Sequence, residues 1–340
     1  MRFGLFGSAS ARRGGAGIRQ QRGISRFHRI QRGGGGARLS QHVRRGAPFH
    51  GIRSGLGHAE SPHLARGAHE PPPSRHCGDG AAMAQPGAAG RTGRDARSPV
   101  RGRLDFGIGK GYRYNEFAGF RMSMEDADAR FDECLEVLLK AWTADEPFSH
   151  RGKYWEFDDI VVEPPPAQKP HPQIWMGAGS ERSIRRVAAQ GFNLLLGQYA
   201  SLTSVASHIA AYKSEVEARG RRFDPMQVGV TRAFFVTDAA EERQAALERR
   251  LQNRVRQLKL ATWPDGTVLG GPDRATGDPR TINENSAMYG TPDEVAKRLE
   301  ELRDVGVGYV LINGGGSGGG ARGRESLRRF AREVMPAFAD

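Results

Sequence analysis

The stretch that decides the fold runs from Ile174 to Gly191 and reads IWMGAGSERSIRRVAAQG. Its first residues are apolar or small and fit a short buried strand, whereas the residues after Ser180 repeat apolar positions at helical spacing. A tight glycine turn separates the two patterns. A strand that passes through such a turn into a helix is the repeating unit of parallel α/β folds.

The same alternation continues on both sides of this stretch. Strands are predicted at residues 1–8, 104–109, 192–197, 228–237 and 309–313, and a strand or hairpin at residues 154–162. Helices are predicted at residues 125–142, 202–219, 239–258 and 291–306, and a closing helix carries the apolar residues of 327–338. Residues 261–288 lack periodicity and are expected to form a mobile loop or lid.

This order predicts an α/β fold, a (β/α)8 TIM barrel. A strand at each end of the chain, with βα units between, fits a closed parallel barrel better than an open sheet. About five strands follow residue 102 and one lies in residues 1–15. The remaining strands would have to lie in residues 9–101, which do not read as strands, so the barrel portion in residues 102–340 is expected to be incomplete.

The first hundred residues differ sharply in composition from the rest. They contain 17 arginines, no lysine and four acidic residues, so the whole formal net charge of +13 lies there. Residues 101–340 contain 34 basic and 34 acidic groups, the balance of an ordinary soluble domain. Residues 16–101 therefore form a low-complexity segment rich in Arg, Gly, Ala, Pro and His.

Two explanations of residues 16–101 stay open. One is translation in a shifted reading frame, because a GC-rich gene read out of frame yields this composition. Synonymous codons for residues 27–54 permit a shifted reading as STEYNVEAEALGFLSTFVVEHHFTGFG, in which a helix and a strand lead to an acid-His-His-Phe motif. The other is a disordered basic arm that binds nucleic acid or acidic surfaces. The arginines are neither clustered with aromatic residues nor set at helical spacing, which favours the first explanation.

Cysteine content and hydropathy indicate the cellular compartment in which the protein is expected. Cys77 and Cys134 are too few for a disulfide framework or a structural zinc site, so no metal is expected and a reducing compartment is the default. Cys134 falls on the apolar face of a predicted helix and is expected in the core. No apolar run approaches the roughly 18 residues of a membrane span, and no signal peptide is evident. A cytoplasmic location without membrane contact is the simplest expectation.

The turn at residues 177–180 permits two interpretations. The backbone N–H groups of Gly179 and Ser180 and the hydroxyls of Ser180 and Ser183 lie at the positive end of a predicted helix, where a phosphate is stabilised. Alternatively, Ser180 is only an N-cap and the glycines only close a tight turn. These residues alone do not decide between the two.

Three segments carry a resemblance to a known family. In this order and spacing they resemble the luciferase-like flavin-dependent monooxygenases, over residues 1–15 and 102–338. The resemblance implies a luciferase-like TIM barrel, an enzyme that uses reduced FMN and O2 on a small organic substrate, and a flavin phosphate held at Gly179, Ser180 and Ser183. The three segments are GRLDFGIGKGYRYNEFAGF at 102–120, FSHRGKYWEF followed by PPPAQKPHPQIW at 148–175, and GAGSERSIRRVAAQG at 177–191.

The resemblance implies roles for three further residues. Lys110 follows a strand at the point where the family commonly has a basic residue that reaches the flavin phosphate; a solvated loop lysine is the alternative. Tyr112 is expected near the isoalloxazine ring or the ribityl chain, and Arg130 resembles an arginine that the family carries on a helix; packing is the alternative for both. The family's ring-side histidine has no counterpart in this chain, so no catalytic residue is assigned.

The expected function is flavin-dependent monooxygenation, with reduced FMN delivered by a separate flavin reductase and with the homodimer frequent in the family. A deazaflavin-dependent oxidoreductase of the same fold is one alternative, distinguished by the cofactor that stays bound. A basic nucleic-acid-binding protein is an alternative of another class, which the unpatterned arginines disfavour, so no nucleic-acid partner is expected. The run GGGSGGG at 314–320 lacks the GxGxxG spacing and the GK[ST] ending of nucleotide loops, and it predicts a flexible loop or a supporting phosphate or lid role.

Overall fold

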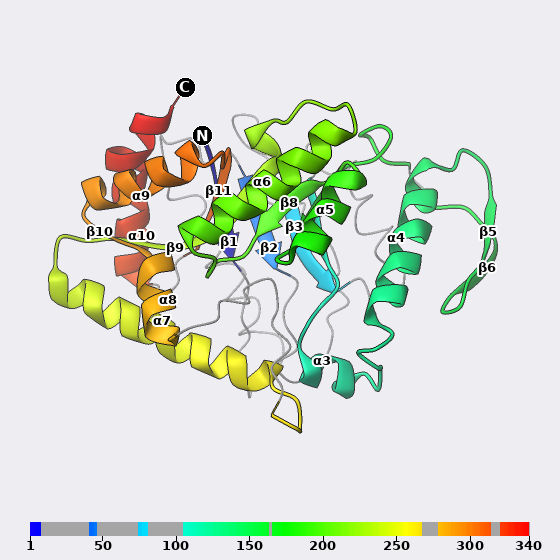
Figure 1. Cartoon of the computed structure of the whole chain (residues 1–340), viewed down its shortest axis with the longest axis horizontal. Coiled ribbons are helices and arrows are strands. Elements are labelled where there is room, and N and C mark those ends of the chain that lie inside the picture. The colour runs from blue at the N-terminus through cyan, green and yellow to red at the C-terminus, as the bar shows by residue number, and fades with distance from the viewer. Residues whose placement is uncertain are drawn as a thin grey trace. The chain divides into compact units, whose positions relative to one another are not determined.

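The computed structural model describes residues 1–7, 41–45, 74–80, 105–162, 165–266, 278–313 and 320–339 of the 340-residue chain (Figure 1). The chain forms two compact units. The first unit contains residues 1–40, 177–259 and 272–340, and the second contains residues 41–176 and 260–271.

The first unit is built on parallel strands around β9 (Val228–Val236). β11 (Tyr309–Asn313) pairs with residues 229–233 of β9, and β1 (Arg2–Gly7) pairs in turn with β11. β8 (Asn193–Leu196) and β10 (Met288–Gly290) pair with different stretches of β9, residues 228–230 and 234–236. All nine residues of β9 are buried, as expected of a strand covered on both faces.

Helices connect these strands, and α5 and α6 pack side by side (Figure 1). The helices of this unit are α5 (Glu181–Ala189), α6 (Leu202–Ala218), α7 (Ala240–Ala261), α8 (Pro279–Ser286), α9 (Pro292–Asp304) and α10 (Gly320–Arg329). Shorter turns are 3-10 at Pro225–Gln227 and Met335–Phe338 and π-helical at Phe330–Val334.

An aromatic cluster ties the closing helix of this unit to its strands. The ring of Phe330 lies edge-on to Phe3 of β1, with centroids 5.3 Å apart, and 5.3 Å from the ring of Phe234 of β9. Phe338 meets Phe3 at 5.8 Å. Edge-to-face pairs at these separations add to the stabilisation from burial. The predicted inner face of the closing helix is confirmed, except that Met335 is only half-buried.

The second unit also has parallel strands: β2 (Gln41–Arg45), β3 (Ser74–Gly80), β4 (Asp105–Gly109) and β7 (Gln173–Gly177), paired in that order. α3 (Tyr114–Gly119) and α4 (Ala127–Thr143) follow β4, and an antiparallel hairpin of β5 (Phe148–Arg151) and β6 (Glu156–Ile160) precedes β7.

The core of this unit forms where α4 packs on β4. Trp142 lies edge-on to Phe106 with centroids 5.0 Å apart, and Trp175 donates its indole N–H to the buried Asp105 carboxylate at 3.2 Å. The side chain of Cys134 is 1% exposed. The prediction that Cys134 belongs to the core is therefore confirmed. The strand or hairpin expected at residues 154–162 is a hairpin that begins earlier, at Phe148.

The structure contains several elements that the sequence-based expectation lacked, α3 among them. β2 and β3 lie within residues 16–101, which were expected to supply no barrel strand; their sequences, QHVRR and SRHCGDG, lack the apolar alternation that predicts strands. α8 lies within the supposed lid of residues 261–288, where Asp278 caps the helix by accepting from the Thr281 N–H at 2.7 Å. β10, only three residues long, is too short to show a period. Most of the glycine run lies outside the described residues.

Candidate functional site

The N-terminus of α5 carries the residues predicted to hold a phosphate. The Ser180 hydroxyl accepts from the Ser183 N–H at 3.3 Å, and the Ser183 hydroxyl accepts from the Ser180 N–H at 3.1 Å. The two hydroxyl oxygens lie 2.9 Å apart in a hydrogen bond. The N-cap interpretation of Ser180 is thus confirmed as a reciprocal capping box.

This cap leaves groups that an anion can use. Ser180 is exposed, Gly179 beside it is half-buried and carries no side chain, and among the described residues no hydrogen bond is made by the N–H groups of Glu181 and Arg182. The first N–H groups of any helix lack intrahelical partners and point toward the positive end of the helix dipole. The arrangement therefore fits a phosphate as well as a cap.

A second helix of the same unit also starts with a serine N-cap, without the reciprocal hydrogen bond that completes a capping box. At the start of α6 the Ser201 hydroxyl accepts from the Ser204 N–H at 3.1 Å, and the two hydroxyls lie 2.9 Å apart. A serine pair at a helix start is therefore not by itself specific for a phosphate. Ser201 provides a control for any experiment on Ser180.

The three further predicted flavin contacts lie in the second unit, around α4. The Lys110 ammonium, directly after β4, forms an exposed ion pair with Asp128 at 2.9 Å. Tyr112 is half-buried, and the guanidinium carbon of Arg113 lies 5.7 Å from the centre of its ring. Arg113 itself is buried and paired with Glu116 at 3.1 Å.

Arg130 lies on α4 and packs against the turn of the β5–β6 hairpin. Its guanidinium carbon lies 4.3 Å from the centre of the Tyr154 ring and 5.8 Å from that of Trp155. These distances are typical of cation–π contacts. The hairpin is one of the segments that carry the family resemblance, and its contacts with Arg130 are structural.

A carboxylate one turn along α4 fixes the hairpin more strongly. The oxygens of Glu133 accept hydrogen bonds from the N–H groups of Tyr154 (3.0 and 3.1 Å) and Trp155 (2.8 Å), and one oxygen lies 3.3 Å from Nε2 of His150. Gly152 lies against this carboxylate, so that a Cβ there would stand 1.9 Å from Oε1 of Glu133. The backbone of Tyr154 and Trp155 is therefore fixed by the Glu133 carboxylate.

In the first unit, buried arginines converge on the loop that follows β8, residues 197–200. Arg232, in the middle of β9, donates from its guanidinium to the carbonyl oxygens of Gly197 (3.1 Å) and Ala200 (2.8 Å). Gln198 accepts at its side-chain oxygen from the Asn313 amide at 3.3 Å. The carboxyl ends of parallel strands are where sites assemble in α/β folds.

Two arginines of α7 complete this cluster. Arg250 donates to the Asn283 carbonyl (2.8 Å), the Asn283 side-chain oxygen (2.6 Å), the Ser286 hydroxyl (3.1 Å) and the Gln198 carbonyl (3.3 Å). Arg250 and Arg254 both stack on Tyr199, with guanidinium carbons 4.4 and 4.0 Å from the ring centre. Arg232, Arg250 and Arg254 are each 2–4% exposed.

Sequence reasoning missed these arginines. α7 is rich in charges, and charged residues in such a helix ordinarily indicate a solvated face. Arg232 gave a usable signal, because an arginine inside the apolar run VGVTRAFFV is a buried charge that needs partners. A buried arginine in a central strand predicts a polar network at that strand.

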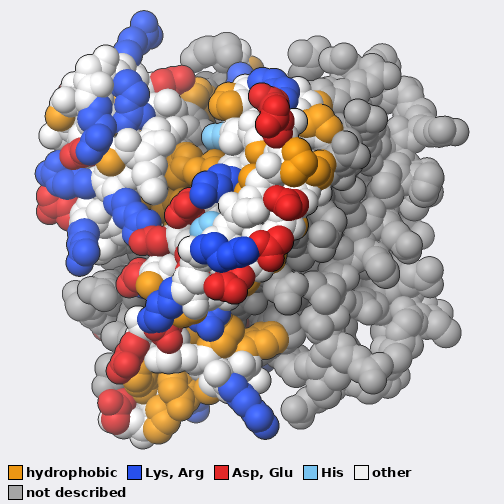
Figure 2. Space-filling model, turned by 90° about the vertical axis from the view of Figure 1, so that its right-hand side faces the viewer, with side chains coloured by type: hydrophobic (Ala, Val, Ile, Leu, Met, Phe, Trp, Pro, Cys, Tyr) orange, Lys and Arg blue, Asp and Glu red, His pale blue; other side chains and the backbone are white. Residues whose placement is uncertain are grey.

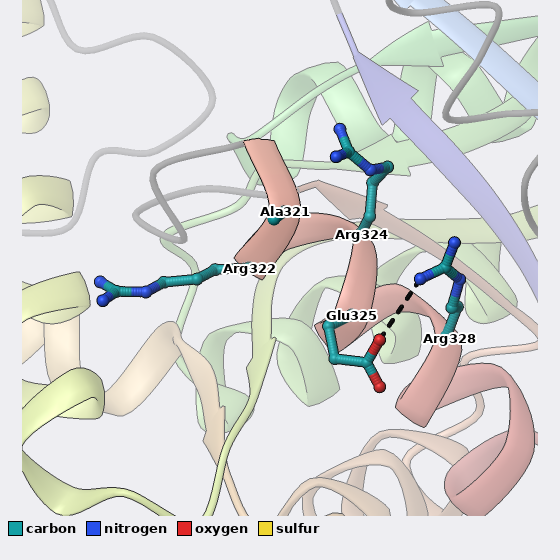
Figure 3. A pocket seen from close by; sticks show the side chains of 5 residues that line it. All are labelled: Ala321, Arg322, Arg324, Glu325 and Arg328. Atoms are coloured by element: carbon teal, nitrogen blue, oxygen red, sulfur yellow. Dashed lines mark hydrogen bonds and ion pairs between the residues drawn. The ribbon is translucent and has the colours of Figure 1, made fainter.

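An open surface depression of about 370 Å³ lies on α10 and is lined by Ala321, Arg322, Arg324, Glu325 and Arg328 (Figure 3). Arg328 donates to the Glu325 carboxylate at 3.4 Å, whereas Arg322 points away from that pair. All of its lining comes from one helix, and the predicted flavin contacts do not line it. Within the described residues no cluster of three or more metal-ligating side chains is present.

Charged side chains of both signs are interspersed on the described surface shown in Figure 2. None of the helices in the described part of the chain combines the length and the apolarity needed to cross a bilayer.

Parallel strands with connecting helices, and a capped helix start open to an anion, define an α/β protein of the TIM-barrel type with a candidate phosphate site. The chain belongs to the luciferase-like monooxygenase family, whose sequence pattern matches residues 86–308. The predicted family and fold class are therefore confirmed. The match begins at residue 86, upstream of the predicted start at Gly102.

Individual relatives are similar at low identity. The FMNH2-dependent dimethylsulfone monooxygenase of Pseudomonas putida is 25% identical over 249 residues, covering 69% of this chain and 66% of that protein. The oxygenase component of the flavin-dependent trigonelline monooxygenase of Acinetobacter baylyi is 24% identical over 255 residues, covering 70% and 69%. The chain spans 59% to 69% of the length of the first curated relatives it matches.

Solved structures share the fold. The oxygenating constituent of 3,6-diketocamphane monooxygenase from Pseudomonas putida, in complex with FMN, superimposes with a TM-score of 0.71 at 20% identity, covering 99% of this chain and 98% of that one. An F420-dependent secondary alcohol dehydrogenase superimposes with a TM-score of 0.71 at 15% identity, covering 100% and 99%.

Proposed function

We propose that this protein is a flavin-dependent monooxygenase that uses reduced FMN and O2 to oxidise a small organic substrate. The observation that carries the proposal is the family match over residues 86–308. The names of two relatives and the FMN complex of a structure with the same fold support it. The flavin supplies the chemistry with oxygen, and the protein must bind its phosphate, orient the substrate and exclude water.

We assign the flavin phosphate to the start of α5. Its oxygens would accept from the N–H groups of Glu181 and Arg182 and from the hydroxyls of Ser180 and Ser183, which now bond to one another. The Glu181 carboxylate is ion-paired with Arg185 at 2.8 Å, which reduces its repulsion of an anion. The residues present therefore fit the group.

Lys110 and Tyr112 are proposed from the family resemblance as a phosphate contact and a contact of the ring or ribityl chain. The ion pair of Lys110 with Asp128 is exposed, and such pairs contribute little stability, so a competing phosphate would meet little resistance. A flavin contact by Arg130 stays a prediction beside its stacking on Tyr154.

A comparison of FMN with riboflavin tests the phosphate site, because the two differ only in the phosphate. We expect Ser180→Ala to weaken FMN binding about 10-fold, the loss of one hydrogen bond to a charged group, without changing riboflavin binding. Quenching of flavin fluorescence measures both affinities. Ser201→Ala removes another serine N-cap and should leave both affinities unchanged. Equal effects of the two substitutions on FMN would contradict the assignment.

A deazaflavin-dependent oxidoreductase is the second candidate, favoured by the F420-dependent dehydrogenase of the same fold. Equilibration of the purified chain with FMN and with F420 separates the two. Retention of FMN through gel filtration supports the first proposal, and retention of F420 alone supports the second.

A separate flavin reductase is the proposed source of reduced flavin, in line with the relative named as an oxygenase component. Substrate turnover with chemically reduced FMN, and none with NADH and oxidised FMN unless a reductase is added, is the expected result.

A further inference from the structure

Among the described residues, Arg254 is the arginine beside Tyr199 that forms no hydrogen bond or ion pair. It is 4% exposed, and its Nε is enclosed without a partner. Its contact is the Tyr199 ring, whose centre lies 4.0 Å from the guanidinium carbon. A buried cation with its hydrogen-bond donors unused is rare, because removal from water is unfavourable unless acceptors replace the water.

The two neighbouring arginines differ from Arg254 in that their terminal N–H groups have acceptors, although Nε of Arg250 is also enclosed without a hydrogen-bond partner. Arg232 donates to the carbonyl oxygens of Gly197 and Ala200, and Arg250 donates to the carbonyl oxygen of Gln198. The carbonyl groups of three of the four loop residues are thus held by these two side chains. Arg254 is not needed to hold the loop in place.

The contact with Tyr199 does not use the N–H donors of Arg254. A guanidinium is planar, with its five N–H donors directed outward in the plane and its faces suited to aromatic stacking. The Tyr199 ring lies 4.0 Å from the guanidinium carbon, and a contact with a ring uses none of these donors. The donor edge of the guanidinium matches a carboxylate or sulfonate, which accepts two parallel hydrogen bonds.

The position of Arg254 suits a ligand site. Ala246, Arg250 and Arg254 form one buried line along α7 at a spacing of four residues. Ala246 packs in the core with Phe235 and Tyr289, and Arg250 reaches the loop after β8. The line therefore ends, at Arg254, beside a loop at the carboxyl end of a parallel strand, where substrates bind in this type of fold.

We propose that Arg254, oriented by Tyr199, binds the carboxylate or sulfonate group of an organic substrate. This inference rests on the proposed monooxygenase function and narrows its substrates to anionic molecules. The oxyanion supplies the acceptors that the buried guanidinium lacks, and Tyr199 acts as a positioning residue.

The test is the thermal unfolding of the full chain at constant ionic strength, without flavin and with saturating FMN. Acetate and methanesulfonate are the anionic probes, and dimethyl sulfone is an uncharged comparator. We expect the anions, and not dimethyl sulfone, to raise the Tm of the wild type. Arg254→Met should weaken the apparent affinity for the anions about 10- to 100-fold, as expected for the loss of charge-assisted hydrogen bonds.

Arg256→Met is the matched control, because Arg256 is an exposed arginine on the same helix. It should leave the response to the anions unchanged. Arg254→Met should also leave the Tm without anions unchanged or raised, because it replaces an unpaired buried charge by an apolar side chain of similar length. A lower Tm without anions, together with no response of the wild type to either anion, would overturn the proposal and make Arg254 a structural residue.

Flavin binding separates this inference from the proposed function. If Arg254→Met weakens FMN binding but not riboflavin binding, and the anions have no effect, Arg254 holds the flavin phosphate and the substrate assignment is wrong. If FMN binds normally and neither anion acts through Arg254, the inference fails and the proposed function stands. If the anions act through Arg254 but no flavin binds, the anion site stands and the proposed function fails.

Discussion

The β5–β6 hairpin and the loop after β8 are both held by buried or half-buried charges, but the charges differ in how far they are satisfied. At the hairpin, Glu133 accepts from two backbone N–H groups and lies beside His150. At the loop, Arg232 and Arg250 have carbonyl acceptors, whereas Arg254 contacts the Tyr199 ring and has no hydrogen-bond acceptor among the described residues. A charge whose hydrogen bonds are all made locally is structural, and one with unused donors indicates a ligand.

The largest expected effect is at Arg250. Arg250→Met leaves the carbonyl of Gln198 and the polar groups of Asn283 and Ser286 without their buried donor, and should destabilise the chain by about 3 to 5 kcal/mol. Urea unfolding followed by circular dichroism measures the change. Arg254→Met, one turn along α7, should cost almost nothing. Similar losses for both variants would remove the distinction between the two arginines.

A substitution of Glu133 tests the hairpin, where the hydrogen bonds of the charged group are made locally. Glu133→Gln removes the charge and one of the two acceptor oxygens facing Tyr154 and Trp155, so we expect a loss of about 3 kcal/mol in the free energy of unfolding. Glu136→Gln on the same helix breaks only an exposed pair with Lys140 and should cost about 0.5 kcal/mol or less. A loss at Glu133 no greater than at Glu136 would show that the hairpin does not depend on this carboxylate.

Gly152→Ala tests the close approach of the hairpin to Glu133. The added methyl would lie 1.9 Å from Oε1 of Glu133 and 2.6 Å from Nε2 of His150, so one of these groups must move. We expect a cost of about 2 kcal/mol, typical of overpacking. Gly119→Ala is the control, since a Cβ there meets nothing within 4 Å. Equal stability of the two variants in urea would contradict the prediction.

The smallest effect concerns pH. The Tyr154 hydroxyl, which donates to Asp126 at 2.6 Å, and then Lys153 hold the pKa of that carboxyl below its ordinary value of 3.8. The unfolded chain therefore binds the proton more readily, and the stabilisation is present above pH 3.8 and is lost as the pH falls through the lower folded pKa. Asp126→Asn should flatten the dependence of the urea midpoint on pH in this acidic range. An unchanged slope would show that Asp126 is not responsible.

The sequence predicted those parts of the fold that rest on local patterns. β9 and β11 are apolar runs, and the helix after Thr291 begins with a threonine, a proline and a capping glutamate, as the structure confirms. β2 and β3 could not be predicted, because QHVRR and SRHCGDG have no apolar periodicity. Their pairing depends on neighbouring strands that are distant in sequence.

The candidate site also has one part that local sequence predicts and one part that depends on tertiary packing. The N-cap of α5 is a local motif, and the capping role of Ser180 could be predicted, whereas its reciprocal hydrogen bonds with Ser183 were found in the structure. The cluster at Tyr199 joins residues from β9, α7 and the loop after β8, and no window of sequence contains them all. Helical spacing places Arg250 and Arg254 on one side of α7, but only tertiary packing shows that this side is buried.

The loop after β8 is held through its backbone carbonyls, and this has a consequence for how the protein can change over evolution. Since Arg232 and Arg250 donate to main-chain oxygens of Gly197, Gln198 and Ala200, these contacts do not depend on which side chains the loop carries. A substitution at Gln198 would therefore lose the hydrogen bond with the Asn313 amide but keep the backbone contacts that hold the loop.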